Sequence, residues 1–258
     1  MKTYALSGGA AGIGAAVADQ LRAQGHRTLV IDVDPAQCAV DIVADLSTAP
    51  GRSAAIAAVE AMATDGLDGF VACAGLGPHI KPRTLIDQVN FFGATRCIEG
   101  LRPLIAARQG AIVVLSSNSA ALPGLDNNHV QALLADDEHE ACRLVADLDG
   151  HNAYAGSKLA LACWVRRNAP DYIREGINLN TVAPGVTRTA LTDAVCEDPY
   201  FGQHMREFSA TIPYGAPASP EMIANAVLFL LSNEARFISG SVLFVDGGHD
   251  AMLRPDQF

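Results

Sequence analysis

The chain has 258 residues, of which 50% are hydrophobic and 6% aromatic, and its formal net charge is −10. This length suits one large domain or two small ones, and an apolar content rich in Ala, Val, Leu and Ile suits a parallel sheet covered by helices. A negative charge spread along the chain argues against nucleic acid or an anionic membrane surface as a partner. We therefore expect an enzyme that acts on a small ligand.

Six cysteines occur, and none of them forms a Cys-x-x-Cys pair, so we expect buried free thiols and no disulfide framework. The first residues lead directly into a strand and a glycine-rich turn, so no signal peptide is expected. No apolar run reaches the length of a membrane span, and the cytoplasm is the expected compartment. The histidines show no metal-ligand spacing, so no metal is expected.

A glycine-rich turn stands at the start of the chain. A short buried strand is expected over residues 3–7 and an apolar-periodic helix from about residue 15 to residue 23. Gly8, Gly12 and Gly14 lie between them, with the spacing G-x3-G-x-G. Bare backbone and a helix N-terminus together form a site for phosphate, so this arrangement predicts a bound dinucleotide.

The second predicted strand, residues 27–32, ends on Asp32. An acid at this position, about 20 residues beyond the glycines, accepts hydrogen bonds from the adenosine ribose and repels a 2′-phosphate. Asp32 therefore predicts NAD(H) in preference to NADP(H). The alternative is a turn aspartate that caps the segment leading to Pro35.

Further strands alternate with helices to the end of the chain. This pattern, with no linker or repeat, predicts a single domain over residues 1–258 with an α/β fold: a Rossmann-type, doubly wound parallel sheet of about seven strands with helices on both faces. Asp45 is expected at a strand end where it could meet adenine. The later strands are expected over residues 41–47, 69–75, 111–117, 178–183 and 241–245, and helices over 51–63, 84–104 and 220–232.

Two segments exceed the 2–6 residues that are usual for a connection between strand and helix. The first is a helical insertion at about residues 118–151, in which residues 133–145 form an amphipathic helical pattern. The second is a loop at about residues 190–218, which is rich in Met and Phe. Both begin at carboxyl ends of strands, where ligands bind in this architecture.

Tyr154 and Lys158 are four residues apart, which places them on one face of a helix. A cation one turn away favours the phenolate and lowers the pKa of the tyrosine, as general acid–base catalysis requires. The spacing alone is common, and a surface pair is the alternative.

Together these residues resemble the short-chain dehydrogenase/reductase family over essentially the whole chain. The resemblance implies that Tyr154 exchanges the proton of the substrate hydroxyl, that Lys158 lowers the Tyr154 pKa and holds the nicotinamide ribose, and that Ser117 binds the substrate oxygen. Ser116 is the main alternative to Ser117. Asn90 is implied to position a water that links Lys158 to solvent.

The resemblance also implies the cofactor site. Cys73 stands where the family has Asn, so bracing of the central strands has to come from elsewhere. Val186 is expected to offer its backbone to the nicotinamide carboxamide and Thr189 to help hold it, with Thr187 as the alternative. The implied NAD-binding residues are Ser7, Gly8, Gly12, Ile13, Gly14, Asp32, Asp45, Leu46, Cys73, Ala74, Gly75, Tyr154, Lys158, Pro184, Gly185, Val186 and Thr189.

Within the family the chain is most similar to the bacterial 3α-hydroxysteroid dehydrogenase/carbonyl reductases, on the segment 73–78, the insertion and the tail 254–258. This implies a steroid or other carbonyl substrate. A non-steroid secondary alcohol, terpene, cyclic or aromatic, is the alternative, and a non-catalytic NAD-binding regulator is a second one. The substrate pocket is expected to be lined by residues 76–78, the insertion just after Ser117 and the loop over residues 191–212. Its apolar lining is expected from Leu76, Gly77, Pro78, Val186, Leu191, Val195, Phe201, Met205, Phe208 and Ile212.

The insertion also bears on assembly. In many relatives the helix with the catalytic tyrosine builds a subunit interface, and an added helical segment would obstruct that surface. We expect a homodimer formed by the 220–232 helix and the last strand, with a tetramer as the alternative.

Overall fold

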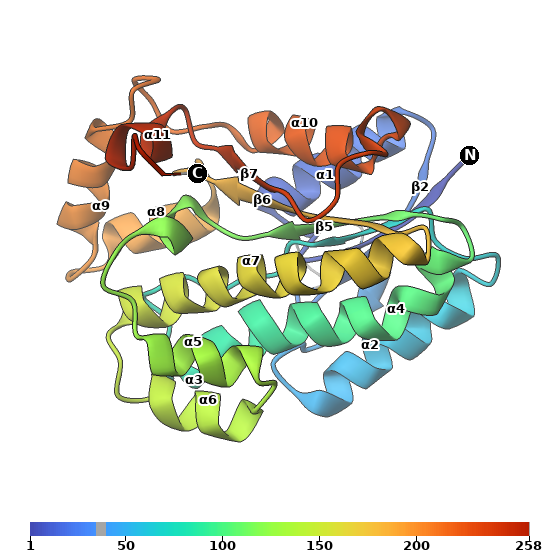
Figure 1. Ribbon diagram of the computed structural model, residues 1–258, viewed down its shortest axis with the longest axis horizontal. Helices are drawn as coiled ribbons and strands as arrows, with labels where there is room; N and C mark the ends of the chain where they lie inside the picture. The colour runs from blue at the N-terminus through green and yellow to red at the C-terminus, as the bar shows by residue number, and fades with distance from the viewer. Residues whose placement is uncertain (35–39, 258) are drawn as a thin grey trace.

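The computed structural model describes residues 1–34 and 40–257, and over these residues seven strands form one parallel sheet. The strand order is β3-β2-β1-β4-β5-β6-β7, so the chain runs outward from β1 in one direction and from β4 in the other. Ligands bind at this point of reversal in doubly wound sheets, and the predicted fold is confirmed (Figure 1). The strands are β1 Thr3–Ser7, β2 Arg27–Asp32, β3 Ile42–Val43, β4 Gly69–Ala72, β5 Ala111–Leu115, β6 Asn178–Pro184 and β7 Val242–Val245.

Helices cover both faces of the sheet. In Figure 1, α1 (Gly12–Ala23) and α10 (Pro220–Leu231) lie above it, and α2 (Ala49–Met62), α4 (Ala94–Ala106) and α7 (Gly150–Arg174) lie below it. Each helix therefore buries one side against the strands, as a doubly wound sheet requires.

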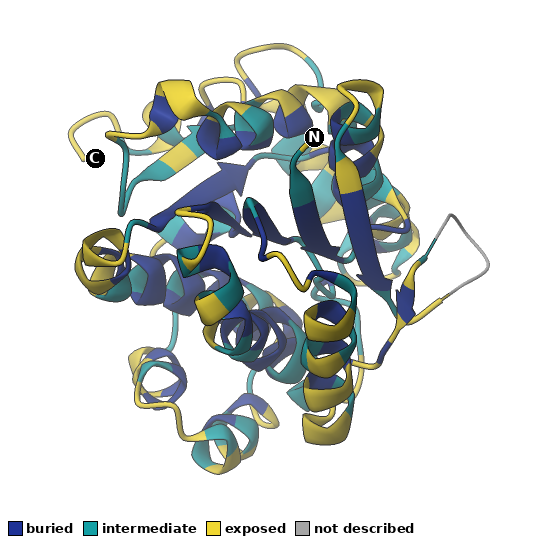
Figure 2. Cartoon of the chain, turned by 90° about the vertical axis from the view of Figure 1, so that its right-hand side faces the viewer, coloured by how far each residue is buried: buried dark blue, intermediate teal, exposed yellow. Residues whose placement is uncertain are grey.

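The core consists of two layers because successive strand residues point to opposite faces. Val71 and Val113 pack with α1 and α10, whereas their neighbours Phe70 and Ile112 pack with α2, α4 and α7. Figure 2 shows the result as buried strands between helices whose outer surfaces are exposed.

The strand expected over residues 41–47 is much shorter in the structure. Only Ile42 and Val43 pair with β2. Beyond them the Asp45 carboxylate accepts the Ser47 N–H at 2.9 Å, and Thr48 caps the start of α2. These side-chain hydrogen bonds to nearby backbone compete with strand pairing and turn the chain into the helix.

The helix expected over residues 84–104 is continuous but irregular. It consists of α3 (Thr84–Asp87), a π-helical stretch (Gln88–Gly93) and α4. The π-helical turn contains Asn90, and such bulges often mark functional sites.

The insertion forms two helices and not the single helix expected over residues 133–145. They are α5 (Asn127–Leu134) and α6 (Glu138–Val145), and the 3-10 helix η2 (Asn118–Ala121) precedes them. The break lies at Asp136, which has a left-handed φ of 61°, and at Asp137, which caps α6 by accepting the Glu140 N–H.

Ion pairs fix the insertion to the domain. Arg52, with a side chain only 4% exposed, makes two hydrogen bonds to Glu138 of α6, at 2.7 and 2.8 Å. The same guanidinium donates to the Gln88 carbonyl in the π-helical turn. His129 of α5 and Asp87 of α3 form a fully buried pair at 2.8 Å. The insertion is therefore a fixed part of the fold.

The loop at residues 190–218 contains α8 (Ala190–Glu197) and α9 (Gly202–Ala210), which lie together at the left of Figure 1. A C-terminal helix, α11 (His249–Leu253), holds the end of α9. The buried His249 ring lies 4.2 Å from the Phe208 ring, and its Nε2 is 2.9 Å from Thr211 Oγ1. A 3-10 helix, η3 (Asn233–Ala235), follows α10.

Neither a membrane-spanning helix nor a metal site is found among the described residues. None of their helices combines the length and apolar character needed to cross a membrane. No group of His, Cys, Asp or Glu among them has the arrangement of a metal site. Of the six cysteines, Cys38 lies outside the described residues, and the five that are described are free thiols.

Candidate active site

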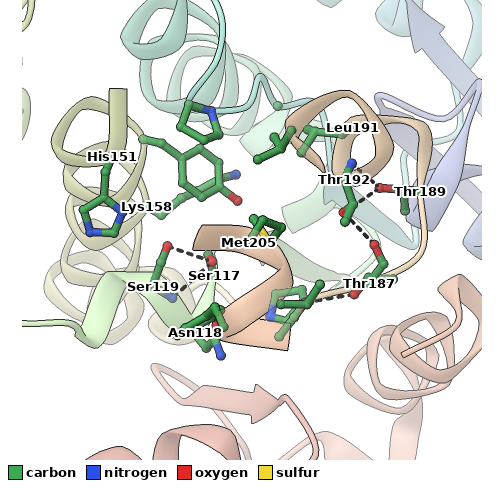
Figure 3. Close-up of a pocket in the computed structure, with 18 of the residues that line it drawn as sticks. Ser117, Asn118, Ser119, His151, Lys158, Thr187, Thr189, Leu191, Thr192 and Met205 are labelled. Carbon is green, nitrogen blue, oxygen red and sulfur yellow. Dashed lines mark hydrogen bonds between the residues drawn. The ribbon is translucent and has the colours of Figure 1, made fainter. Parts of the chain in front are cut away.

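A cavity of about 660 Å³ opens at the carboxyl ends of the central strands, and Tyr154 and Lys158 line it. Its other walls come from the ends of β5 and β6 and from α8 and α9. In Figure 3, Ser117, Ser119 and Lys158 lie on one side of the cavity, and Thr189, Leu191 and Thr192 lie on the other. The cavity is therefore at the place where this architecture binds ligands.

Tyr154 and Lys158 project from one face of α7, as their spacing predicts. The Lys158 ammonium lies 6.0 Å from the centre of the Tyr154 ring and donates to the Leu115 carbonyl at 2.8 Å. Lys158 is 5% exposed, and burial lowers its pKa to about 8. A lysine with this pKa exchanges its proton near neutral pH.

The Tyr154 pKa differs from the prediction. Burial raises it, and a hydrogen bond with Ser117 opposes that shift. The predicted net lowering of the Tyr154 pKa is therefore wrong for this arrangement, because burial outweighs the groups that favour the phenolate. The hydroxyl of Ser117 is one of those groups.

The two serines at the end of β5 have different surroundings. Ser116 Oγ donates to the Lys158 carbonyl oxygen at 2.7 Å and so braces α7. Ser117 Oγ accepts hydrogen bonds from Ser119 and approaches Tyr154. The geometry therefore favours Ser117 over Ser116 as the residue that meets a substrate.

Asn90 is fully buried, and its side chain serves as a brace. Its Oδ1 accepts the Leu76 N–H at 2.7 Å, and its Nδ2 donates to the Leu76 carbonyl and to Ser157 Oγ, both at 3.1 Å. Both amide hydrogens are thus occupied. The predicted link through a water remains a prediction, and the side chain has no N–H left for it.

The glycine turn fits a dinucleotide phosphate. α1 begins at Gly12, earlier than expected, so that Gly14 lies in its first turn. A Cβ at Gly14 would lie 2.1 Å from the Gly8 oxygen, and one at Gly8 would lie 2.5 Å from Ala74 Cα. The N-terminus of α1 has no side-chain cap and no acid in its first turn, so its positive dipole end is open to an anion.

Asp32 lies beside this turn. Its Oδ2 accepts the Ala10 N–H at 3.0 Å, and its Oδ1 accepts the Val33 N–H at 2.8 Å. Oδ1 also accepts the Asp34 N–H at 3.5 Å. The carboxylate thus fixes the turn to β2, and Oδ2 keeps a second lone pair for a ribose hydroxyl. The cap alternative from the sequence is also present, since the Val33 bond is such a turn contact.

Asp45 and Leu46 follow β3. Asp45 is exposed and bonds only locally in the described structure, to Ser47 and Thr48. The Leu46 side chain is buried in the core, so only its backbone is available to a ligand. Contact of either residue with adenine stays a prediction.

The segment after β4 lies between the glycine turn and Lys158. The Ala74 N–H donates to Ser7 Oγ at 3.4 Å, and the Cys73 N–H donates to the Ser7 carbonyl at 3.1 Å. Ser7 therefore supplies bracing that the Cys73 side chain does not. A Cβ at Gly75 would lie 3.3 Å from Lys158 Nζ, so a side chain at this position would require the ammonium to shift slightly.

The residues after β6 complete the wall opposite Tyr154. Pro184, Gly185, Val186 and Ile13 line the cavity, together with four threonines. Thr189 caps α8, and its Cγ2 would lie 3.1 Å from a Cβ at Gly12, so it adjoins the glycine turn. Thr187 instead donates to the Gly185 carbonyl at 3.0 Å. The geometry thus favours Thr189 over Thr187 as the cofactor contact.

The apolar lining agrees in part with expectation. Ile212 lies in a separate cavity of about 170 Å³, and Leu76 and Gly77 do not line the main one. Leu76 packs against the Ile86 cluster, and a Cβ at Gly77 would lie 3.2 Å from Leu191. The expected residues that do line the main cavity are Pro78, Val186, Leu191, Val195, Phe201, Met205 and Phe208.

Several polar lining residues were not singled out from the sequence, although most lie in the two segments expected to line the pocket, the insertion just after Ser117 and the loop over residues 191–212. Each stands outside a recognisable motif, so its position becomes apparent only when η2, α7 and α9 come together. His151 is the exception, since it lies three residues before Tyr154 and so shares its face of the helix. The polar residues not singled out are Asn118, Ser119, His151, Thr192, His204, Glu207 and Thr211.

Comparisons with known proteins agree with this site. Family models described as short chain dehydrogenase and as Enoyl-(Acyl carrier protein) reductase match residues 2–129 and 142–250. The 3-alpha-hydroxysteroid dehydrogenase/carbonyl reductase of Comamonas testosteroni is 41% identical over 100% of both chains. The cis-4-hydroxycyclohexanecarboxylate dehydrogenase of Sinomonas cyclohexanicum is 30% identical over 96% of both chains.

A solved structure matches at the level of the whole fold. It is the 3-alpha-hydroxysteroid dehydrogenase from Pseudomonas sp. B-0831 complexed with NADH, with 42% identity and a TM-score of 0.94 over 99% of this chain and 100% of that one. The predicted resemblance to the 3α-hydroxysteroid dehydrogenase/carbonyl reductases is thus confirmed. On sequence and fold alike, the chain belongs to the short-chain dehydrogenase family.

Proposed function

We propose that this protein is an NAD-dependent oxidoreductase that interconverts a secondary alcohol and a ketone. The observation that carries the proposal is the meeting of Tyr154, Ser117 and Lys158 in one cavity beside the glycine turn. A phenol, a hydroxyl donor and an ammonium are the groups that proton exchange with an alcohol oxygen requires. A regulator that only bound NAD would not need this set.

Each residue has a defined role in the reaction. Tyr154 takes the hydroxyl proton during oxidation and returns it during reduction. Ser117 hydrogen-bonds the substrate oxygen and fixes the carbon for reaction. Lys158 supplies a positive charge below the phenol and a donor to the nicotinamide ribose, and Asn90 holds the segment at Leu76 in place. NAD+, when bound, accepts the hydride, and NADH returns it.

The cofactor would be held by the glycine turn, Asp32 and the segment after β6. The turn and the α1 N-terminus suit the pyrophosphate, and Asp32 suits the adenosine ribose. Val186 and Thr189 adjoin the cavity on the side of the turn and suit the carboxamide. The NADH bound to the Pseudomonas relative supports NAD as the cofactor.

The substrate is proposed to be a flat apolar alcohol or ketone of the 3α-hydroxysteroid or carbonyl type. The side chains from α8 and α9 are mainly apolar, and the names of two relatives support a hydroxysteroid. A smaller cyclic alcohol is the alternative, which the Sinomonas relative's name supports.

A substrate panel tests this proposal. We expect NADH formation, measured by its absorbance, from NAD+ and a 3α-hydroxysteroid, with higher kcat/KM than from a substituted cyclohexanol. A reversed order would favour the cyclic-alcohol alternative. Binding of NADH without turnover of any alcohol or ketone would favour the regulator.

Asp32 provides a test of cofactor choice. Asp32→Asn keeps an oxygen acceptor but removes the negative charge, so the ratio of the NADPH and NADH dissociation constants should fall about tenfold. Asp32→Ala also removes the bond to the Ala10 N–H and should weaken NADH as well. Fluorescence titration measures both constants. An unchanged ratio in Asp32→Asn would assign the discrimination to another residue.

Lys158 predicts the pH dependence of cofactor binding. Burial lowers its pKa to about 8, so the ammonium loses its charge as pH rises through that value. Because kcat/KM reports on the free enzyme, kcat/KM for NADH should fall about tenfold per pH unit above 8. The Cys73 thiol, whose pKa burial raises to about 12, does not titrate in this range. A flat profile from pH 7 to 9.5 would contradict the role of Lys158.

The assembly is proposed to be a homodimer through α10 and β7. β7 is at one edge of the sheet, and Leu243, Met222 and Phe229 on these two elements are 37%, 43% and 45% exposed. The insertion covers part of α7, where α5 packs, and so obstructs the other common surface. A tetramer that persists on dilution in light scattering would contradict this.

The free thiols fit a reducing compartment, for which we propose the cytoplasm.

A further inference from the structure

Ser119 lies in η2, two residues after Ser117, and lines the same cavity (Figure 3). Its Oγ donates to Ser117 Oγ at 2.9 Å, and its backbone N–H donates to the same atom at 3.2 Å. Two donors of one residue thus converge on the hydroxyl that is proposed to meet the substrate. The roles described so far make no use of this residue.

The number of hydrogen bonds that Ser117 Oγ accepts determines the direction in which its own hydrogen points. A serine hydroxyl has two lone pairs and one hydrogen. Ser119 occupies both lone pairs, so the hydrogen of Ser117 is directed away from Ser119 and toward the cavity. There the Tyr154 phenol takes part in a hydrogen bond with Ser117, which agrees with this direction.

We propose that Ser119 is a positioning residue that holds Ser117 as a hydrogen-bond donor toward the substrate oxygen; this inference rests on the proposed oxidoreductase function. During reduction the carbonyl oxygen gains negative charge as the carbon receives the hydride. A donor that is already oriented stabilises that charge more than it stabilises the ground state. A donation into Ser117 also polarises its O–H bond, as in other hydrogen-bonded chains. The orientation of Ser117 by Ser119 should therefore affect kcat more than KM.

A purely structural role for Ser119 would depend on its backbone N–H and not on its hydroxyl. The Ser117 side chain caps η2 by accepting the Ser119 N–H, and this backbone donor survives any substitution of Ser119 except proline. Ser119→Ala removes only the hydroxyl donor and leaves the cap. Ser119→Thr keeps both donors and serves as the matched control.

Steady-state kinetics of ketone reduction with NADH tests the inference. Ser119→Ala should lower kcat about five- to tenfold, the effect of one hydrogen bond, with KM within about twofold of wild type. Ser119→Thr should restore kcat to within about twofold. In a Ser117→Ala background, where no hydroxyl is left to position, Ser119→Ala should have no further effect.

The contrary outcomes are distinct. A wild-type kcat for Ser119→Ala, or an equal loss in the Ser117→Ala background, would overturn the positioning role while the proposed function stands. Thermal unfolding of each variant separates a loss of folded protein from a loss of kcat. A wild-type protein that turns over no alcohol or ketone with NAD(H) would overturn the proposed function, and the role of Ser119 with it.

Discussion

Tyr154→Phe should fold, bind NADH as wild type does, and lose about 10²- to 10⁴-fold in kcat. The substitution removes one oxygen atom, which is the atom proposed to exchange the substrate proton. The aromatic ring stays, so the wall of the cavity keeps its shape. Stopped-flow or steady-state absorbance of NADH measures the loss, and fluorescence titration measures NADH binding.

Tyr172→Phe is the matched control. Tyr172 lies on the same helix, α7, but packs against Trp164 and Arg102 and does not line the cavity. It should keep wild-type kcat. A Tyr154→Phe variant with more than about a tenth of the wild-type kcat would refute the acid–base role of Tyr154, because a single general acid contributes more than that.

The sequence alone predicted most of the scaffold. Near-continuous apolar runs such as the one at β5 identify buried parallel strands, and the glycine turn locates the start of α1. The strand expected after Asp41 was too long, because the Asp45 and Thr48 side chains redirect the backbone there. Such local competition is weakly encoded in hydrophobic patterning, which reports burial.

The insertion shows a second limit. Residues 133–145 have helical periodicity throughout, but Asp136 adopts a left-handed conformation and its carboxylate pairs with Arg96 of α4. That partner is distant in sequence, so the break between α5 and α6 depends on a tertiary contact. The buried pair of His129 and Asp87 likewise depends on how the chain folds.

The residues of the candidate site were predicted better from the sequence than their pKa shifts and hydrogen-bond partners were. Tyr154, Lys158 and Ser117 are brought together as their motif implies. The predicted direction of the Tyr154 pKa shift was wrong, because burial raises this pKa and outweighs the hydrogen bond with Ser117. The sequence did not predict the partners of the Asn90 side chain, which are Leu76 and Ser157. Distances of this kind are set by packing between elements.

Gly14→Ala should be the most damaging change at the cofactor site. An added Cβ would lie 2.1 Å from the Gly8 oxygen and 3.0 Å from Gly9 Cα, and neither backbone atom can move by changing a rotamer. Overpacking of this kind should lower the free energy of unfolding by about 1–3 kcal/mol. To relieve the contact, the turn must separate from the N-terminus of α1. Loss of one charge-assisted hydrogen bond to the pyrophosphate should then raise the NADH dissociation constant about 10- to 100-fold.

Gly124→Ala is the control for the loss of glycine itself. Gly124 has a φ of 83°, but a Cβ there would meet no atom within 4 Å. The change should cost about 1 kcal/mol of stability from backbone strain and leave the NADH dissociation constant unchanged. Denaturant unfolding and NADH titration of both variants separate strain from steric conflict. If Gly14→Ala binds NADH as tightly as Gly124→Ala does, the contact between turn and helix does not form the phosphate site, and the pyrophosphate must be held by other groups.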